Sequence, residues 1–96
     1  MHVISERKLR EFWRKHPAAE EPLRAWHRAV KHVAWQNFAQ VRALYPSADQ
    51  VGKFTVFNIG GNKYRLIAVI HYDYPRVFVR HVLAHAEYSR GNWKDD

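Results

Sequence analysis

The sequence predicts an α+β fold, in which N-terminal helices pack on one face of an antiparallel β-sheet. Two observations support that prediction. Apolar residues recur at helical spacing through the first half of the chain, and beyond about residue 50 they alternate as they do in strands. A chain of 96 residues has room for about one hydrophobic core, so we expect a single domain over residues 1–96.

The first helix is expected directly after a short apolar strand at residues 2–4. Ser5 is a residue type that caps the N-termini of helices. The apolar residues that follow recur at helical spacing, and they are Leu9, Phe12 and Trp13. The helix ends at His16, because the residue before Pro17 avoids the helical conformation.

A second helix fits residues 20–35, and it carries two stripes. Pro22 is tolerated in its first turn. The apolar stripe consists of Leu23, Trp26, Val30 and Val33. The basic stripe consists of Arg24, Arg28 and Lys31. A short third helix follows within residues 37–49 and stops before Pro46.

Three strands are expected in the second half, at about residues 53–59, 63–71 and 76–84. A two-residue turn at Gly60 and Gly61 joins the first pair, because glycine adopts positive φ angles without steric cost. The segment "YDYP" at residues 72–75 makes the second turn.

These turns predict which residues share the face of the sheet that the helices leave open. Opposite residues of an antiparallel pair lie on the same face, and Asn58 is expected opposite Lys63. The second turn is expected to set Ile67 opposite Arg80, which places Arg65 and Arg80 on that face as well. His81 is expected on the other face, toward the helices. Three cations on one exposed face predict a phosphate-binding surface, and the alternative is a merely solvated basic face.

The composition of the chain favours an anionic partner. Sixteen Lys and Arg residues against nine Asp and Glu residues give a net charge of +7, which is spread through the chain rather than collected in a tail. Such a distribution favours a nucleic acid. A binding module without chemistry, and a surface that docks an acidic protein, fit the same charge.

Several classes of site are excluded or not expected. The chain has no cysteine, which excludes disulfides, thiolate metal ligands and a cysteine nucleophile and fits a reducing compartment. Its seven histidines form no HExxH motif, so we expect no metal site and no cofactor. No apolar run approaches the ~18 residues of a membrane span, and the N-terminus lacks a signal-peptide pattern. We therefore expect a cytoplasmic location and no membrane contact.

The C-terminal segment adds groups that transfer protons. His85 and Tyr88 lie where the last strand ends, so strand alternation does not decide where they point. Both side chains can act in acid–base catalysis, and Tyr88 can also stack on a base. The alternative is that they pack in the interior. Trp93 is the tryptophan that lies apart from the helix stripes.

The segments "VISERKLREFWRKHP" and "VFNIGGNKYRLIAVIHYDYPRVFVRHVLAHAEY", with their spacing, resemble the HigB-type toxins of bacterial toxin–antitoxin systems. These toxins belong to the RelE-like mRNA interferase superfamily, and the resemblance covers about residues 3–88. It implies a RelE-like fold with an active site on the concave sheet face. It also implies metal-independent cleavage of mRNA, often on the translating ribosome, and neutralisation by a HigA-type antitoxin with a helix-turn-helix domain.

The resemblance also extends to single residues. The basic strand positions of the family resemble Lys63, Arg65 and Arg80, and its C-terminal histidine and tyrosine resemble His85 and Tyr88.

One segment departs from the family. Its usual "THAEYD" is "AHAEYS" here, with Ala84 for the threonine and Ser89 for the acid. If that acid assists chemistry, activity is weaker here. If it caps a turn, Ser89 can do the same.

A mechanism follows as a hypothesis. Arg65 and Arg80 hold the scissile phosphate, since guanidinium groups match phosphate oxygens bidentately, and Lys63 adds a point charge. His85 or Tyr88 moves protons while the 2′-OH attacks phosphorus, which leaves a 2′,3′-cyclic phosphate. Asn58 is expected to contact the RNA. The basic stripe on the second helix is expected to contact ribosomal RNA or an acidic patch of the antitoxin, or to be solvated.

Overall fold

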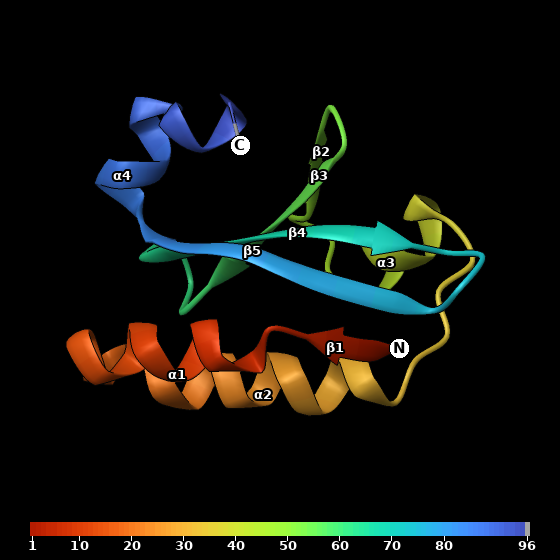
Figure 1. Ribbon diagram of the computed structural model, residues 1–96, viewed down its shortest axis with the longest axis horizontal. Coiled ribbons are helices and arrows are strands. Elements are labelled where there is room, and N and C mark those ends of the chain that lie inside the picture. Colours follow the sequence, from red (N-terminus) through yellow and green to blue (C-terminus); the bar gives the residue numbers. More distant parts are fainter. Residues whose placement is uncertain (96) are drawn as a thin grey trace.

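The computed structural model describes residues 1–95 and confirms an α+β fold (Figure 1). In chain order its elements are β1 (His2–Ile4), α1 (Glu6–Lys15), α2 (Glu20–Lys31), α3 (Phe38–Leu44), β2 (Asp49–Val51), β3 (Phe54–Ile59), β4 (Tyr64–His71), β5 (Arg76–Ala84) and α4 (His85–Arg90). Short 3-10 turns lie at Pro17–Ala19 and Asn92–Asp95. Within residues 1–95, no helix is both long and apolar enough to cross a bilayer.

The strands form one five-stranded sheet in the order β1-β5-β4-β3-β2. Strands β2 to β5 are antiparallel, whereas β1 runs parallel to β5. The predicted strand at residues 2–4 is therefore present, but it makes the sheet mixed rather than purely antiparallel. The sequence did not indicate β2, which is three residues long and pairs with β3.

The two faces of the sheet are covered by different parts of the chain. Helices α1 and α2 lie on one face, and α4 lies on the other (Figure 1). The larger core includes the buried α2 residues Leu23, Trp26 and Val30, which pack with strand residues such as Phe57 and Leu66. A smaller cluster lies on the opposite face and consists of Phe54, Val56, Ile67 and Trp93.

Two local predictions in the helical half differ from the structure. Ser5 occupies the predicted N-cap position of α1, but its side chain makes no capping hydrogen bond, and its left-handed φ of 73° turns the chain from β1 into the helix. The second helix ends at Lys31 instead of residue 35. Beyond its end the chain turns so that Trp35 stacks on Phe57 in the core, with ring centroids 6.1 Å apart.

The turn between β3 and β4 is longer than predicted. Ile59 pairs with Tyr64, so the loop comprises residues 60–63 rather than two glycines. Asn58 consequently lies opposite Arg65 instead of Lys63. The register moves by two residues, and an even shift leaves every side chain on its predicted face. The prediction that Asn58 and Arg65 share a face is therefore confirmed.

A β-bulge changes the predicted alternation in β5. Ile67 pairs with His81, but the next residue, Ala68, pairs with Val79, so Arg80 is an extra residue without a partner in β4. One inserted residue inverts the alternation on one side of the bulge. His81 therefore shares the face of Ile67 and Arg65, and its predicted place toward the helices is wrong. The predicted pairing of Ile67 with Arg80 is also wrong.

Candidate functional site

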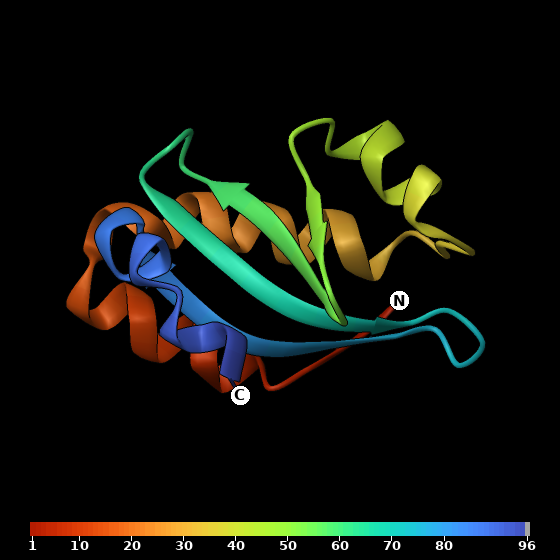
Figure 2. The same ribbon diagram turned by 90° about the horizontal axis from the view of Figure 1, so that it is seen from above.

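Five of the candidate residues gather at the end of the sheet where the β3–β4 loop meets the start of α4. Figure 2 shows this loop and α4 at the same end, with the β4–β5 turn at the other. Asn58 and Arg65 are paired across β3 and β4. The backbone N–H of His85 donates to the carbonyl of Lys63 over 3.0 Å. The Arg65 guanidinium carbon lies 5.4 Å from the ring centroid of Tyr88.

Arg65 is the most enclosed cation of this group, with 7% of its surface exposed. Its Nη1 donates to the carbonyls of Asn62 and Tyr64 over 3.3 and 3.1 Å. Its Nη2 donates to Asn62 Oδ1 over 2.5 Å. These bonds fix the orientation of the guanidinium, and its low exposure strengthens its electric field because little water screens it. The sequence did not indicate Asn62, whose only signal was a polar residue in the turn "GGN".

Aromatic stacking holds the C-terminal segment over Arg65. The rings of Tyr88 and Trp93 stack with centroids 5.2 Å apart and an interplanar angle of 12°. Trp93 Nε1 donates to the carbonyl of Tyr88 over 3.0 Å, and its ring packs edge-on against Phe54 at 5.6 Å. Trp93 is only 4% exposed. It therefore belongs to the packing that positions Tyr88 and does not present a free stacking surface.

Helix α4 begins at His85 with an incomplete cap. The Glu87 carboxylate accepts a hydrogen bond from the backbone N–H of Ala84 over 3.3 Å. Ala84 has no side-chain oxygen with which to complete a reciprocal capping box. Ser89 Oγ donates to the carbonyl of His85 over 3.0 Å. The hydroxyl at the position where the resemblance implies an acid is thus engaged with the helix backbone.

Arg80 and His81 lie in a different environment, at the bulge of β5. Arg80 is exposed, and its carbonyl accepts a hydrogen bond from Lys8 Nζ of α1 over 2.9 Å. Both residues line a groove of about 580 Å³ between α1 and β5, and Arg65 is not among its lining residues. The bulge thus directs Arg80 toward α1, whereas Arg65 packs under α4. The sequence did not indicate His81 as a site residue, because a bulge has no reliable local signature.

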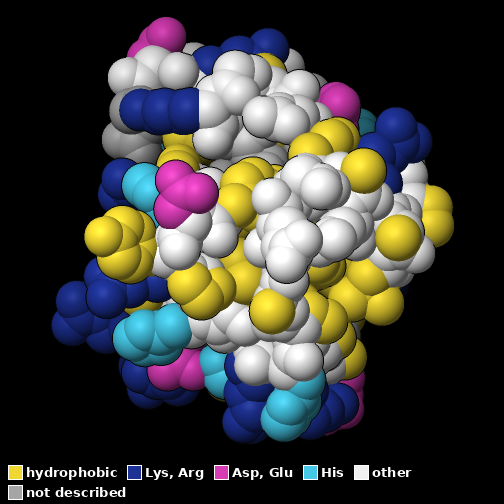
Figure 3. All heavy atoms as spheres, turned by 90° about the vertical axis from the view of Figure 1, so that its right-hand side faces the viewer, with side chains coloured by type: hydrophobic (Ala, Val, Ile, Leu, Met, Phe, Trp, Pro, Cys, Tyr) yellow, Lys and Arg dark blue, Asp and Glu magenta, His cyan; other side chains and the backbone are white. Residues whose placement is uncertain are grey.

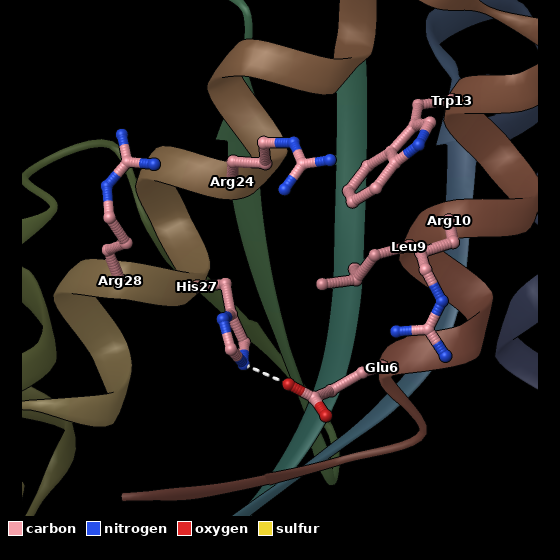
Figure 4. A pocket seen from close by; sticks show the side chains of 7 residues that line it. All are labelled: Glu6, Leu9, Arg10, Trp13, Arg24, His27 and Arg28. Carbon is pink, nitrogen blue, oxygen red and sulfur yellow. Dashed lines mark ion pairs between the residues drawn. The ribbon is translucent and has the colours of Figure 1, made fainter.

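The basic stripe of α2 lies on the helix layer, away from Arg65. Arg24 donates to the Glu20 carboxylate over 2.8 Å and stacks over the Trp13 ring at 4.7 Å. Arg24 and Arg28 line a pocket of about 360 Å³ between α1 and α2, where His27 is ion-paired with Glu6 (Figure 4). Arg28 points out of this pocket in Figure 4. Lys31 is exposed at the end of the helix.

The end of the molecule formed by α3 and the β4–β5 turn has a different character. Figure 3 shows hydrophobic side chains gathered on this side, with Lys and Arg mainly toward its rim. Tyr74 in the turn is 73% exposed and Leu44 in α3 is 46% exposed. Lys63 in the β3–β4 loop and Arg65 at the start of β4 lie at the opposite end of the sheet (Figure 2). Within residues 1–95, no three His, Asp or Glu side chains come together as metal ligands.

Known proteins resemble this chain over nearly its whole length. Residues 19–91 match the family model HigB_toxin, described as the RelE-like toxic component of a toxin–antitoxin system. An mRNA interferase HigB of Escherichia coli O6:H1 is 33% identical over 93 residues, which cover 94% of this chain and 90% of that relative. The mRNA interferase toxin HigB of E. coli K12 is 29% identical over 92 residues, covering 93% and 88%. An mRNA interferase HigB of Shigella flexneri gives the same values.

Proposed function

Because this chain belongs to the HigB toxins, the RelE-like toxic components of toxin–antitoxin systems, we propose that it is an mRNA interferase, an endoribonuclease that arrests translation by cutting mRNA. The observation that most directly supports the proposal is the enclosed Arg65 guanidinium. It is held by Asn62 and lies against the ring of Tyr88. Arg65 pairs with Leu83, and two residues beyond this pair the backbones of Lys63 and His85 are hydrogen-bonded to each other. This group combines fixed positive charge with side chains that transfer protons.

In the proposed reaction the ribose 2′-oxygen attacks the adjacent phosphorus while the bond to the 5′-oxygen breaks. The products are a 2′,3′-cyclic phosphate and a 5′-hydroxyl. Arg65 stabilises the charge that builds on the phosphate. A guanidinium has five N–H donors, and its three bonds to the chain leave donors for phosphate oxygens. Such preorganised charge commonly supplies the largest part of catalysis.

The remaining residues have supporting roles in this proposal. Lys63, exposed in the loop, adds a positive charge near the phosphate. His85 and Tyr88 are the candidates for taking the proton of the 2′-OH and returning one to the 5′-oxygen. Asn58, paired with Arg65 on the same face, contacts the RNA beside it.

We revise the role of Arg80 within the proposal. Arg65 and Arg80 were expected to bind one phosphate together. The bulge and the groove beside α1 favour separate phosphates instead, with Arg80 on a neighbouring nucleotide.

The proposed partners follow from the family and from the placement of the α2 stripe. We infer that mRNA is cut on the translating ribosome in the cytoplasm, and that a HigA-type helix-turn-helix antitoxin neutralises the chain. Arg28 and Lys31 are exposed on the helix layer, away from Arg65. That surface can contact ribosomal RNA or an acidic patch of the antitoxin while the candidate site stays accessible.

The test is to incubate the purified chain with mRNA in the presence of a chelator, with and without translating ribosomes. We expect cleavage whose upstream fragments end in a 2′,3′-cyclic phosphate. Growth arrest on expression, relieved by the co-expressed antitoxin, tests the toxin role in cells. RNA binding without any cleavage in either condition contradicts the nuclease and supports a non-catalytic binding module.

A further inference from the structure

Two hollows adjoin along β5 and share part of their walls. The first is the groove of about 580 Å³ between α1 and β5, and the second is a smaller hollow of about 260 Å³ between β5 and the C-terminal turn. His81 and Glu87 line both of them. The two hollows therefore adjoin at these residues, and together we call them the β5 groove. It runs from α1, past the bulge, to the segment that covers Arg65.

The edge of β5 is open here because its parallel partner is short. Strand β1 pairs only with residues 76–78 of β5, and the chain then enters α1. Beyond residue 78, one face of α1 lies along this edge of β5. Residues on that face recur at i, i+3, i+4 and i+7, and they are Lys8, Glu11, Phe12 and Lys15. Lys8 anchors the arrangement through its hydrogen bond to the Arg80 carbonyl.

Positive charge dominates the part of the groove beside α1. Its cations are all exposed, and they are Lys8, Arg14, Lys15 and Arg80. Two carboxylates oppose them. Glu11 is ion-paired with Arg7 over 3.4 Å, and Glu87 accepts the backbone N–H of Ala84. Both carboxylates are thus already engaged, and an anionic chain entering the groove meets a net positive field.

Flat aromatic surface accompanies these cations. The rings of Phe12 and His16 stack with centroids 4.4 Å apart and an interplanar angle of 22°. Tyr64 packs edge-on against Phe12 at 5.4 Å and keeps the pair in place. Both stacked residues are half-buried and line the groove. Cations interleaved with planar rings are the surface that single-stranded nucleic acid binds, through phosphates and stacked bases.

We propose that the β5 groove binds the single-stranded RNA that flanks the cleavage site, through Lys8, Arg14 and Lys15. The inference rests on the proposed nuclease function and extends it, because it gives the substrate a path beyond Arg65. Arg80 and His81, at the bulge, lie where this path approaches the candidate site. An acidic protein also complements the charge, but it has no need of the stacked Phe12 and His16 rings.

The experiment compares two triple variants with the wild type. The groove variant carries Lys8→Ala, Arg14→Ala and Lys15→Ala. The control variant carries Arg10→Ala, Arg42→Ala and Lys53→Ala, which remove the same charge from exposed positions outside the groove. Affinity is measured by fluorescence anisotropy with a short single-stranded 2′-O-methyl RNA, which lacks the attacking hydroxyl and stays intact. Circular dichroism melting checks that each variant folds.

We expect the groove variant to bind RNA more weakly and with a smaller salt dependence. Three lost phosphate contacts lower the slope of log affinity against log salt by about 2. The control variant is expected to keep most of the salt dependence of the wild type. The proposal is overturned if the two variants lose RNA affinity equally, or if the groove variant keeps the affinity of the wild type. Loss of antitoxin neutralisation with unchanged RNA binding assigns the groove to an acidic protein and also overturns it.

Cleavage of unmodified RNA by the wild type is measured in parallel, with and without ribosomes. If the wild type does not cut RNA while the groove variant still loses RNA affinity, the nuclease proposal fails, and the groove remains a binding surface for single-stranded RNA without an adjoining cleavage site. If the wild type cuts RNA and the two triple variants bind it equally, the nuclease stands and the groove proposal fails.

Discussion

Arg65 and Arg80 belong to adjacent strands of one sheet, and their surroundings are opposites. Arg65 is 7% exposed, is bonded to Asn62 and Tyr64, and lies under the ring of Tyr88. Arg80 is exposed in a bulge that faces α1, and its backbone carbonyl accepts from Lys8. One guanidinium is thus held in a fixed orientation, whereas the other is free to follow an incoming ligand.

The difference shows how two parts of one basic surface can serve separate functions. A fixed, poorly hydrated cation stabilises charge that develops at one point, without having to reorganise during the reaction. An exposed cation attracts a polyanion and is screened by salt. The Arg65 region therefore suits transition-state stabilisation, and the Arg80 region suits RNA capture.

The largest effect on cleavage is expected from removing the Arg65 guanidinium. Arg65→Ala should lower the cleavage rate by about 10²–10³-fold, because it removes a preorganised donor. It should also lower the free energy of unfolding by about 1–3 kcal/mol, since it removes the three hydrogen bonds of a buried guanidinium. Single-turnover cleavage and chemical denaturation measure the two effects.

Arg80→Ala is the matched comparison. We expect weaker RNA binding, a salt slope smaller by about 0.7, and a free energy of unfolding within about 0.5 kcal/mol of the wild type. A loss of cleavage at saturating RNA as large as that of Arg65→Ala would erase the distinction between the two regions. A fully toxic Arg80→Ala would remove Arg80 from the site.

A smaller kinetic effect is expected within the Arg65 region itself. His85→Gln retains a polar side chain but cannot transfer a proton at neutral pH, so cleavage should slow by about 10²-fold. RNA affinity should change little, because the phosphate-binding cations remain. Rates at saturating RNA and anisotropy titrations separate the two quantities. Equal losses in rate and affinity would argue that His85 only binds RNA.

The smallest effect concerns the start of α4, which carries His85 and Tyr88. Ala84 is extended, with φ −70° and ψ 158°, as N-cap residues are. Ala84→Thr adds the hydroxyl that completes a capping box with Glu87, and it should raise the free energy of unfolding by about 0.5–1 kcal/mol. Thermal melting measures the change. Ala84→Val has the same shape without the acceptor, and an equal gain there would exclude capping as the cause.

The candidate site was predictable to the extent that it depends on strand alternation. Asn58 and Arg65 share their predicted face because the error in the turn was two residues, which preserves alternation. The face of His81 was predicted wrongly, because the extra residue Arg80 inverts the strand alternation. Asn62, which orients Arg65, was missed because a turn residue gives no sign of the side chain that it will meet.

The sequence by itself determined the order of β1, α1 to α3 and β3 to β5, the face that α2 buries and the basic character of the chain. These properties depend on composition and on the periodicity of residues close together in the sequence. Only the tertiary structure decided that β1 joins β5 in parallel, that α1 lines the bulged edge, and that Trp93 fixes Tyr88 over Arg65. Each of these contacts joins residues distant in sequence, and packing in three dimensions selects it.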